Sequence, residues 1–289
     1  MIVCYGEVLW DVFPKAVKPG GAPMNVAYHL NKLGMETNII SRIGADEEGE
    51  RMLSQLENWQ LSTDWCQQDS EYPTGSVLAT MGKDHEMSYE IRNPAAWDYI
   101  QWQPEFETLI RSAEAFVFGS LVTRNTVSRH TLFTMLEIAP YRVFDVNIRP
   151  PFSSIGIIRE LLERVDMVKM NEAELRLLLS TYNVEFTTAQ NGARFLLDKF
   201  SLKEIIITRG SRGALYLNND THYDLLAKQV PVKDTVGSGD SFLAGFLARK
   251  LQGKPLEEAM NFAIGLSAFV TTQEGACPDY NPAELIIGR

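Results

Sequence analysis

Cysteine and histidine are scarce in this chain of 289 residues, which contains three Cys and four His. Cys4, Cys66 and Cys277 lie far apart, are odd in number and lack the short spacing of metal ligands. Neither a disulfide framework nor a cysteine-based metal site is therefore indicated. Unpaired cysteines are typical of a reducing compartment, so we expect a cytoplasmic protein.

Positive charge is also limited, because 27 Lys and Arg stand against 37 Asp and Glu, for a formal net charge of -10. Sequence-independent binding of nucleic acid depends on clustered basic side chains, and the sequence has no such cluster. We therefore expect no nucleic-acid partner. A local phosphate site remains compatible with this charge, because backbone N–H groups at a helix start bind phosphate without net positive charge.

Long apolar runs are missing as well. No stretch of about 18 uninterrupted apolar residues occurs, so we expect no membrane-spanning helix. Residues 1–7 lack the basic and long apolar regions of a signal peptide. The sequence therefore predicts no membrane partner.

The chain does contain a regular alternation of strand-like and helix-like segments. Short apolar runs predict strands at Ile2–Tyr5, Thr37–Ile43, Ala115–Phe118, Arg142–Val146, Met167–Met170 and Glu204–Thr208. Apolar residues at helical spacing predict helices at Met24–Leu33, Asp46–Trp59, Thr126–Ile138, Ile155–Glu163, Glu172–Leu179, Ala189–Phe200, Ser238–Leu251 and Leu256–Thr272. This alternation predicts an α/β fold in which a mainly parallel sheet is covered on both faces. We interpret residues 1–289 as a single domain.

Residues from about 63 to 100 interrupt this alternation. Short segments such as 76–81 and 87–91 alternate apolar and polar side chains, which is typical of antiparallel hairpins. We interpret this part as a small β-sheet lid inserted at the edge of the main fold, with a lid loop at about 10–20. An exposed face of such a lid sheet would also suit pairing of two subunits into a homodimer.

The segment 234–240, Asp-Thr-Val-Gly-Ser-Gly-Asp, directly precedes a helical pattern. Two glycines let the backbone approach a ligand, and the free N–H groups of a first helical turn suit phosphate oxygens. Gly237, Ser238 and Gly239 would donate to a phosphoryl group. Asp240, which the helix start should keep ionised, would orient and deprotonate an attacking hydroxyl. The other interpretation is a helix start whose Gly and Ser serve only turn geometry and capping.

The same seven residues resemble the Asp-Thr-x-Gly-Ala-Gly-Asp signature of the ribokinase-like (PfkB) family of carbohydrate kinases, with Ser238 in place of Ala. Other motifs follow in the family's order, and together they cover most of the chain: Gly-Gly-Ala-Pro-Met-Asn-Val-Ala at 20–27, in the form typical of fructokinases, Asp-Val-Asn-Ile-Arg-Pro at 145–150, Asn-Glu-Ala-Glu at 171–174 and Thr-Arg-Gly at 208–210. The resemblance implies a ribokinase-like three-layer α/β/α fold with a small β-sheet lid, and an ATP-dependent phosphotransferase.

On the family pattern, the sugar side of the site comes from the first part of the chain. Asp11 would accept hydrogen bonds from sugar hydroxyls, and Asn25 would present its amide to the same sugar. Gly20 and Gly21 would form a tight turn that brings the backbone to the substrate. Without the resemblance, Asp11 would be interpreted as a solvated loop acid and Asn25 as a helix-start residue.

Two further side chains leave alternatives open on the sugar side. Arg149 would touch the substrate or the transferring phosphate, or else pair with an acid at the sheet edge. Trp97 lies in an Ala-Trp-Asp segment similar to one in bacterial fructokinases. It would stack near the sugar, or else be a core or dimer-contact aromatic.

The nucleotide side is expected to consist largely of glycines and small polar residues. The resemblance assigns ATP binding to Asn171, Thr208, Gly210, Gly213, Thr235, Gly237 and Gly239.

Two cation sites are implied as well. Asn171 and Glu174 share a face at a helix start and would hold Mg²⁺ through water. Their alternative role is a capping box, and both roles can hold at once. Asp234 and Val236, with the loop at 275–278, would form a monovalent-cation site for K⁺.

We predict an ATP-dependent sugar kinase with fructose as the acceptor. Within the family, the alternatives are a ribokinase, a nucleoside kinase and a kinase of keto-deoxy sugar acids. A non-catalytic homologue that binds a sugar or a nucleotide is the alternative from a different class. A dinucleotide-dependent oxidoreductase is disfavoured, because the first strand is not followed by a Gly-x-Gly-x-x-Gly turn that opens a helix.

Overall fold

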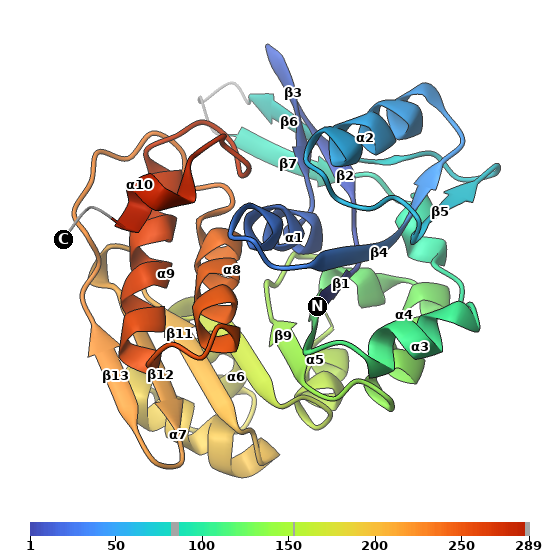
Figure 1. Ribbon diagram of the computed structural model, residues 1–289. Helices are drawn as coiled ribbons and strands as arrows, with labels where there is room; N and C mark the ends of the chain where they lie inside the picture. The colour runs from blue at the N-terminus through green and yellow to red at the C-terminus, as the bar shows by residue number, and fades with distance from the viewer. Residues whose placement is uncertain (82–86, 153, 287–289) are drawn as a thin grey trace.

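The computed structural model describes residues 1–81, 87–152 and 154–286. Among these residues, the main sheet has nine strands in the order β13-β12-β11-β10-β9-β8-β1-β4-β5 (Figure 1). They are β1 (Ile2–Tyr5), β4 (Thr37–Gly44), β5 (Cys66–Asp69), β8 (Ala115–Gly119), β9 (Arg142–Asp145), β10 (Met167–Asn171), β11 (Glu204–Thr208), β12 (Ala214–Asn218) and β13 (His222–Leu225). Pairing is parallel from β5 to β11 and antiparallel for β12 and β13. The predicted mainly parallel sheet is confirmed.

Helices cover both faces of this sheet (Figure 1). One face packs against α3 (Glu105–Arg111), α4 (Thr126–Leu136), α5 (Ile155–Leu162), α6 (Glu172–Ser180) and α7 (Ala189–Phe200). The other packs against α1 (Ala22–Lys32), α2 (Glu47–Asn58), α8 (Ser238–Leu251) and α9 (Leu256–Thr271). Because successive side chains of a strand point to opposite faces, Val3 and Tyr5 of β1 enter the first core, and Ile2 and Cys4 enter the second.

A second, four-stranded sheet lies beside the main one, in the order β3-β2-β6-β7. It combines β2 (Leu9–Phe13) and β3 (Ala16–Gly20) with β6 (Gly75–Met81) and β7 (Met87–Ile91). The segment interpreted as a lid loop at about 10–20 is therefore a β-hairpin. Of the segment interpreted as an insertion, β5 belongs to the main sheet, because it pairs in parallel with β4. Residues 82–86, between β6 and β7, lie outside the described residues.

The strands β12 and β13 were not expected from the sequence, nor was α3. The turn between the two strands is closed by Asn218, whose Oδ1 accepts the N–H groups of Asp220 and Thr221 at 2.9 and 2.7 Å. The short apolar run Ala-Leu-Tyr-Leu of β12, which ends at Asn218, is the sequence signal for this hairpin. Together the two strands extend the sheet beyond its parallel part. Gly213, just before β12, and Ala227, just after β13, line a pocket at this end of the sheet.

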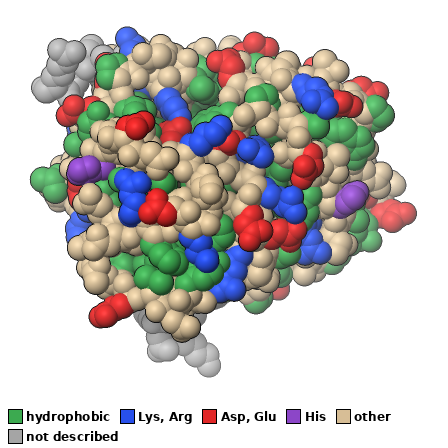
Figure 2. All heavy atoms as spheres, turned by 90° about the horizontal axis from the view of Figure 1, so that it is seen from below, with side chains coloured by type: hydrophobic (Ala, Val, Ile, Leu, Met, Phe, Trp, Pro, Cys, Tyr) green, Lys and Arg blue, Asp and Glu red, His purple; other side chains and the backbone are tan. Residues whose placement is uncertain are grey.

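Two expectations about the surface concern membranes and nucleic acid. Among the described residues, no helix combines the length and apolar character needed to cross a bilayer. On the face in Figure 2, Lys and Arg side chains are interspersed with Asp and Glu. That face therefore carries no single large basic patch of the kind that binds phosphate backbones.

Candidate active site

The glycine-rich turn opens α8, as predicted. Gly237 precedes the helix with φ of 74°, a left-handed conformation that favours glycine. A Cβ at this position would lie 2.5 Å from the Cα of Ala276. The turn and the loop near the C-terminus are therefore in close contact only because residue 237 is glycine.

Asp240, in the first turn of α8, is buried, with 9% of its surface exposed. Its Oδ2 accepts a hydrogen bond from Nδ2 of Asn25 at 2.8 Å. Burial raises the pKa of Asp240 above its ordinary value, and the nearby Lys169 ammonium lowers it in part. Desolvation thus outweighs the neighbouring charges that favour ionisation, so the carboxyl is more basic than its position at a helix start alone would make it.

Asn25 lies in the first turn of α1, directly after the Gly20–Gly21 pair. Its side-chain Oδ1 accepts from the thiol of Cys277 at 3.3 Å, which orients its Nδ2 toward Asp240. Gly21 has φ of 115°, and a Cβ there would overlap the carbonyl oxygen of Glu7. The di-glycine pair therefore packs tightly against the end of β1, as a close backbone approach requires.

Asp11, on β2, pairs in register with Lys18 of β3. Its carboxylate lies against Gly20 of the same strand, where a Cβ would overlap it. Burial raises the pKa of Asp11 to about 6; the positive charge of Arg149 lowers it, and the negative charge of Asp240 raises it. Asp11, Arg149 and Asp240 are therefore close enough for their charges to interact. The structure thus brings together residues that the sequence separates widely.

Glu7, which follows β1, belongs to the same group but was not given a role from the sequence. It is 3% exposed, and its Oε2 has no hydrogen-bond partner among the described residues. Burial raises its pKa to about 7, and the charge of Asp240 raises it further. A glutamate directly after a buried apolar strand is the sequence signal that could have identified it.

Trp97, for which the sequence left a sugar contact and a core or dimer-contact role open, lies in the core. Its side chain is fully buried in the core, in a short 3-10 helix at Ala96–Tyr99. The guanidinium of Arg124 lies 3.9 Å from its ring centroid and also pairs with Asp98 at 2.6 Å. Stacking on a sugar is therefore excluded in this conformation, and the core alternative is the correct one. The reason is packing: a Cβ on Gly75 would lie only 2.5 Å from the indole Nε1, so Trp97 supports β6 from within.

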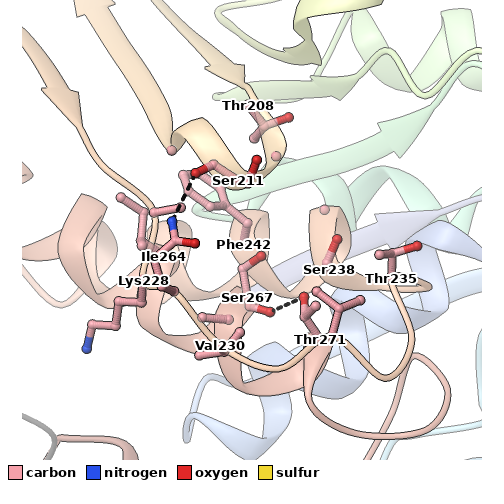
Figure 3. A pocket seen from close by; sticks show the side chains of 17 residues that line it. Thr208, Ser211, Lys228, Val230, Thr235, Ser238, Phe242, Ile264, Ser267 and Thr271 are labelled. Atoms are coloured by element: carbon pink, nitrogen blue, oxygen red, sulfur yellow. Dashed lines mark hydrogen bonds between the residues drawn. The ribbon is translucent and has the colours of Figure 1, made fainter.

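A pocket of about 260 Å³ lies between the end of β11, the loop at 227–235 and the helices α8 and α9 (Figure 3). The predicted nucleotide residues Thr208, Gly210, Gly213, Thr235 and Gly239 all line it, and Ser238 does as well. Phe242, Ile264 and Ala268 add apolar walls. Gly237 and Asn171 do not line this pocket.

Asn171 and Glu174 form the capping box that was the alternative to a metal role. Asn171 Oδ1 accepts the Glu174 N–H at 2.9 Å, and Glu174 Oε2 accepts the Asn171 N–H at 2.8 Å. Glu174 Oε1 also accepts the N–H of Ile148 at 2.8 Å. The described residues contain no group of three or more His, Cys, Asp or Glu arranged to hold a metal. Direct coordination of a metal by several protein side chains is thus not supported at this site.

Asp234 links the glycine-rich turn to the loop near the C-terminus. Its Oδ1 accepts the N–H of Val236, and its Oδ2 accepts the N–H of Gly275, both at 3.0 Å. The residues predicted for a monovalent cation are therefore adjacent, and each carboxylate oxygen keeps a lone pair for a further partner.

The comparisons with known proteins agree with this geometry. Residues 2–284 match the family described as pfkB family carbohydrate kinase. Fructokinase-2 of Solanum habrochaites is 27% identical over 308 residues, which cover 96% of this chain and 92% of the relative. Among solved structures, a Vibrio cholerae O395 fructokinase with fructose, ADP and calcium bound is 25% identical. It has a TM-score of 0.84 and covers 99% of this chain and 97% of its own.

A fructokinase from Xylella fastidiosa with bound ATP shares the fold, with a TM-score of 0.86, 22% identity and coverage of 99% of this chain and 97% of its own. The predicted three-layer ribokinase-like fold is thereby confirmed. The family match extends over nearly the whole chain and includes the glycine-rich turn with Asp240. The chain therefore belongs to the pfkB family of carbohydrate kinases, phosphotransferases that act on an alcohol group.

Proposed function

We propose that this protein is an ATP-dependent fructokinase. One observation carries the proposal: Asp240 lies between the pocket that contains Gly239 and the polar group formed by Asp11, Asn25 and Arg149. A carboxylate at such a boundary is suited to transfer of a phosphoryl group from a nucleotide to a hydroxyl. Fructose is favoured as the acceptor because the similar plant and bacterial proteins are named fructokinases.

The sugar would bind in the space around Asp11, Asn25 and Arg149. Asp11 would accept hydrogen bonds from sugar hydroxyls, and Arg149 would donate to the sugar or to the transferred phosphate. The backbone at Gly20 and Gly21 would approach the sugar directly, since neither residue carries a side chain. A set of acceptor and donor groups of this kind suits a polyol.

Asp240 would act as the base. The acceptor hydroxyl oxygen attacks the γ-phosphorus of ATP, the bond to the bridging oxygen breaks to release ADP, and the hydroxyl proton passes to Asp240. The raised pKa of Asp240 makes its ionised form a better proton acceptor than an exposed carboxylate. Asn25 would hold the carboxylate in position through its 2.8 Å hydrogen bond.

The start of α8 would stabilise the transferring group. The first backbone bond between successive turns of α8 runs from the N–H of Ser241 to the carbonyl oxygen of Gly237 at 2.8 Å, so the N–H groups of Gly239 and Asp240 precede it, as does that of Gly237. They would donate to phosphoryl oxygens, and the helix dipole adds partial positive charge at the same place.

Two cations fit this chain as accessories. Asn171 and Glu174 would hold Mg²⁺ through water, because their oxygens already accept backbone N–H groups but keep free lone pairs. Magnesium on the nucleotide phosphates would neutralise part of their charge. Asp234, with the backbone at Val236, would hold K⁺ between the glycine-rich turn and the loop at Gly275.

The four-stranded sheet would serve both as a lid and as a dimer surface. Val12 pairs directly with Val17 and with Leu78, so these side chains form one row on the same face. Val17 and Leu78 are each 45% exposed. Asp11 precedes Val12 and points to the opposite face, toward the sugar space. Analytical ultracentrifugation of the wild type and of Leu78→Asp tests the pairing; a wild-type monomer at all concentrations would refute it.

A coupled assay of ADP release with a panel of sugars tests the activity. We expect fructose to give the highest kcat/KM among fructose, ribose, nucleosides and keto-deoxy sugar acids. A large preference for ribose or a nucleoside would refute fructose as the substrate. Binding of sugar and ATP without turnover would instead show a non-catalytic homologue.

A further inference from the structure

Lys169 is a buried lysine in a strand that is otherwise apolar up to its last residue. It lies in β10 with 6% of its surface exposed. In the parallel register it stands beside Asp145 of β9, and its Nζ donates to Asp145 Oδ2 at 2.7 Å. A buried ammonium carries a large desolvation cost, so its retention in a strand core requires a partner or a function.

The ammonium of Lys169 lies directly against the glycine-rich turn. A Cβ on Gly239 would be 2.9 Å from Lys169 Nζ. Gly239 is not among the glycines with positive φ, so its backbone does not require glycine. The space that the missing side chain leaves is used by the ammonium, which explains this glycine independently of turn geometry.

Asp240 follows Gly239 and shares the environment of this lysine. The charged and titratable groups that act on Asp240 or are acted on by it are Glu7, Asp11, Asp145, Arg149, Lys169 and Cys277. Two of them are cations, and of these only Lys169 is buried. After burial, the charge of Lys169 is the largest influence on the Asp240 carboxyl, and the charge of Asp145 acts in the opposite direction.

The Lys169–Asp145 pair also has unused hydrogen-bonding capacity. An ammonium has three N–H donors, and the structure gives one of those of Lys169 to Asp145. Asp145 Oδ1 is buried and has no partner among the residues that the structure describes. A pair that served packing alone would be expected to satisfy both carboxylate oxygens.

We propose that Lys169, held by Asp145 in the space left by Gly239, is a positioning residue that keeps the Asp240 carboxylate ionised and fixed for the acceptor hydroxyl. The proposal rests on the phosphoryl transfer proposed above. It assigns Asp145 the role of holding the ammonium, and it assigns Gly239 the role of making room for it.

The acid limb of the kcat/KM profile for the sugar, at saturating MgATP, tests this role. Activity requires ionised Asp240 and is lost as the pH falls through its pKa. Lys169→Met removes the cation that favours ionisation, so we expect the limb to move to higher pH. Asp145→Asn removes a neighbouring anion, while the amide oxygen of Asn still accepts from the ammonium and holds it in place, so we expect the limb to move to lower pH. A limb displaced by about one pH unit changes kcat/KM about tenfold on its acid side.

Two further variants guard against a failure to fold. Gly239→Ala would displace the ammonium, which is the far end of a flexible chain, and should move the limb upward as Lys169→Met does. Lys203→Met is the matched control, because this lysine pairs with Asp166 at 2.8 Å and is 64% exposed on the side chain. We expect its limb to equal that of the wild type. Thermal unfolding of all variants distinguishes a loss of stability from a true shift of the acid limb of the pH profile.

Opposite shifts in Lys169→Met and Asp145→Asn would support the inference, since a purely structural pair would not move the limb in opposite directions. If the wild type phosphorylates a sugar and every variant has the same acid limb as the wild type, the role of Lys169 is overturned and the proposed function stays intact. A wild type without turnover on any sugar would overturn both.

Discussion

The proposed nucleotide side and the proposed sugar side of the site consist of different kinds of residues. The nucleotide side consists largely of backbone and small residues, such as Gly210, Gly213 and Ser238. The sugar side holds the buried carboxyl of Glu7 and the partly buried carboxyl of Asp11, whose pKa values desolvation raises to about 7 and about 6. Under the proposed function, one side would recognise phosphates by shape and backbone donors, and the other would depend on charges shielded from water.

Asp240→Asn should give the largest effect, because it removes the proton acceptor at the boundary of the two sides. We expect kcat to fall by about 10²- to 10⁴-fold. The KM values for sugar and ATP should change little, since Asn keeps the size of the side chain. Steady-state kinetics measures both, and a wild-type kcat in this variant would refute the role of Asp240.

Glu7→Gln should show how strongly the buried carboxyl of Glu7 makes the stability of the protein depend on pH. The pKa of Glu7 is raised to about 7 from 4.5, so the folded protein keeps this proton at a pH where the unfolded chain has lost it. The contribution of this proton to the free energy of unfolding is complete below about pH 4.5 and is lost as the pH rises through about 7. The free energy of unfolding should therefore fall by about 2–3 kcal/mol more in the wild type than in Glu7→Gln between about pH 5 and pH 8. Urea unfolding at both pH values checks this, and parallel pH curves for the two proteins would contradict it.

Asp11→Asn should affect the sugar side alone. Loss of charged hydrogen bonds to sugar hydroxyls costs about 1.5–3 kcal/mol, which corresponds to a rise of about 10- to 100-fold in the sugar KM. The KM for ATP should stay within about twofold. An equal rise of both KM values would show that the two sides are not separable in this way.

Gly213→Ala is the counterpart on the nucleotide side. Gly213 has φ of 97°, and a Cβ there would overlap the carbonyl oxygen of Leu225. We expect the ATP KM to rise by about 5- to 10-fold and the stability to fall by more than about 1 kcal/mol. The sugar KM should not change. Kinetics at saturating levels of the other substrate distinguish the two KM values.

Ser238→Ala should have the smallest effect. The variant restores the residue typical of the family and keeps the backbone N–H that would face the phosphate. We expect kcat and both KM values within about twofold of the wild type. A larger change would show that the Ser238 hydroxyl takes part in nucleotide binding.

Most of the fold followed from local patterns in the sequence. The helix that begins at Ser238 and the strand at Ile2–Tyr5 lie where apolar spacing predicted them. The hairpin at β2 and β3 and the strands β12 and β13 were missed, because short strands with charged or turn residues give weak periodic signals. Pairing with distant strands, rather than local preference, stabilises them.

The predictions of site residues agree with the structure less consistently than those of the helices and strands. Gly213, Thr208 and Thr235 line one pocket, as their motifs predicted. Trp97 was wrong as a sugar contact, because its burial depends on packing against Gly75 and Arg124 rather than on its own segment. Lys169 was missed, although a lysine within an apolar strand was visible in the sequence.

The sequence by itself determined the glycine-rich helix start, the order of the motifs and the placement of the family's acidic residues, because each depends on residues only a few positions apart. The tertiary structure alone decided how those acids are charged. Asp240 meets Asn25 from 215 positions away. Lys169 donates to Asp145, 24 positions away, on the adjacent strand. Desolvation and charge act through space, so the protonation of this site is set by neighbours that no local pattern identifies.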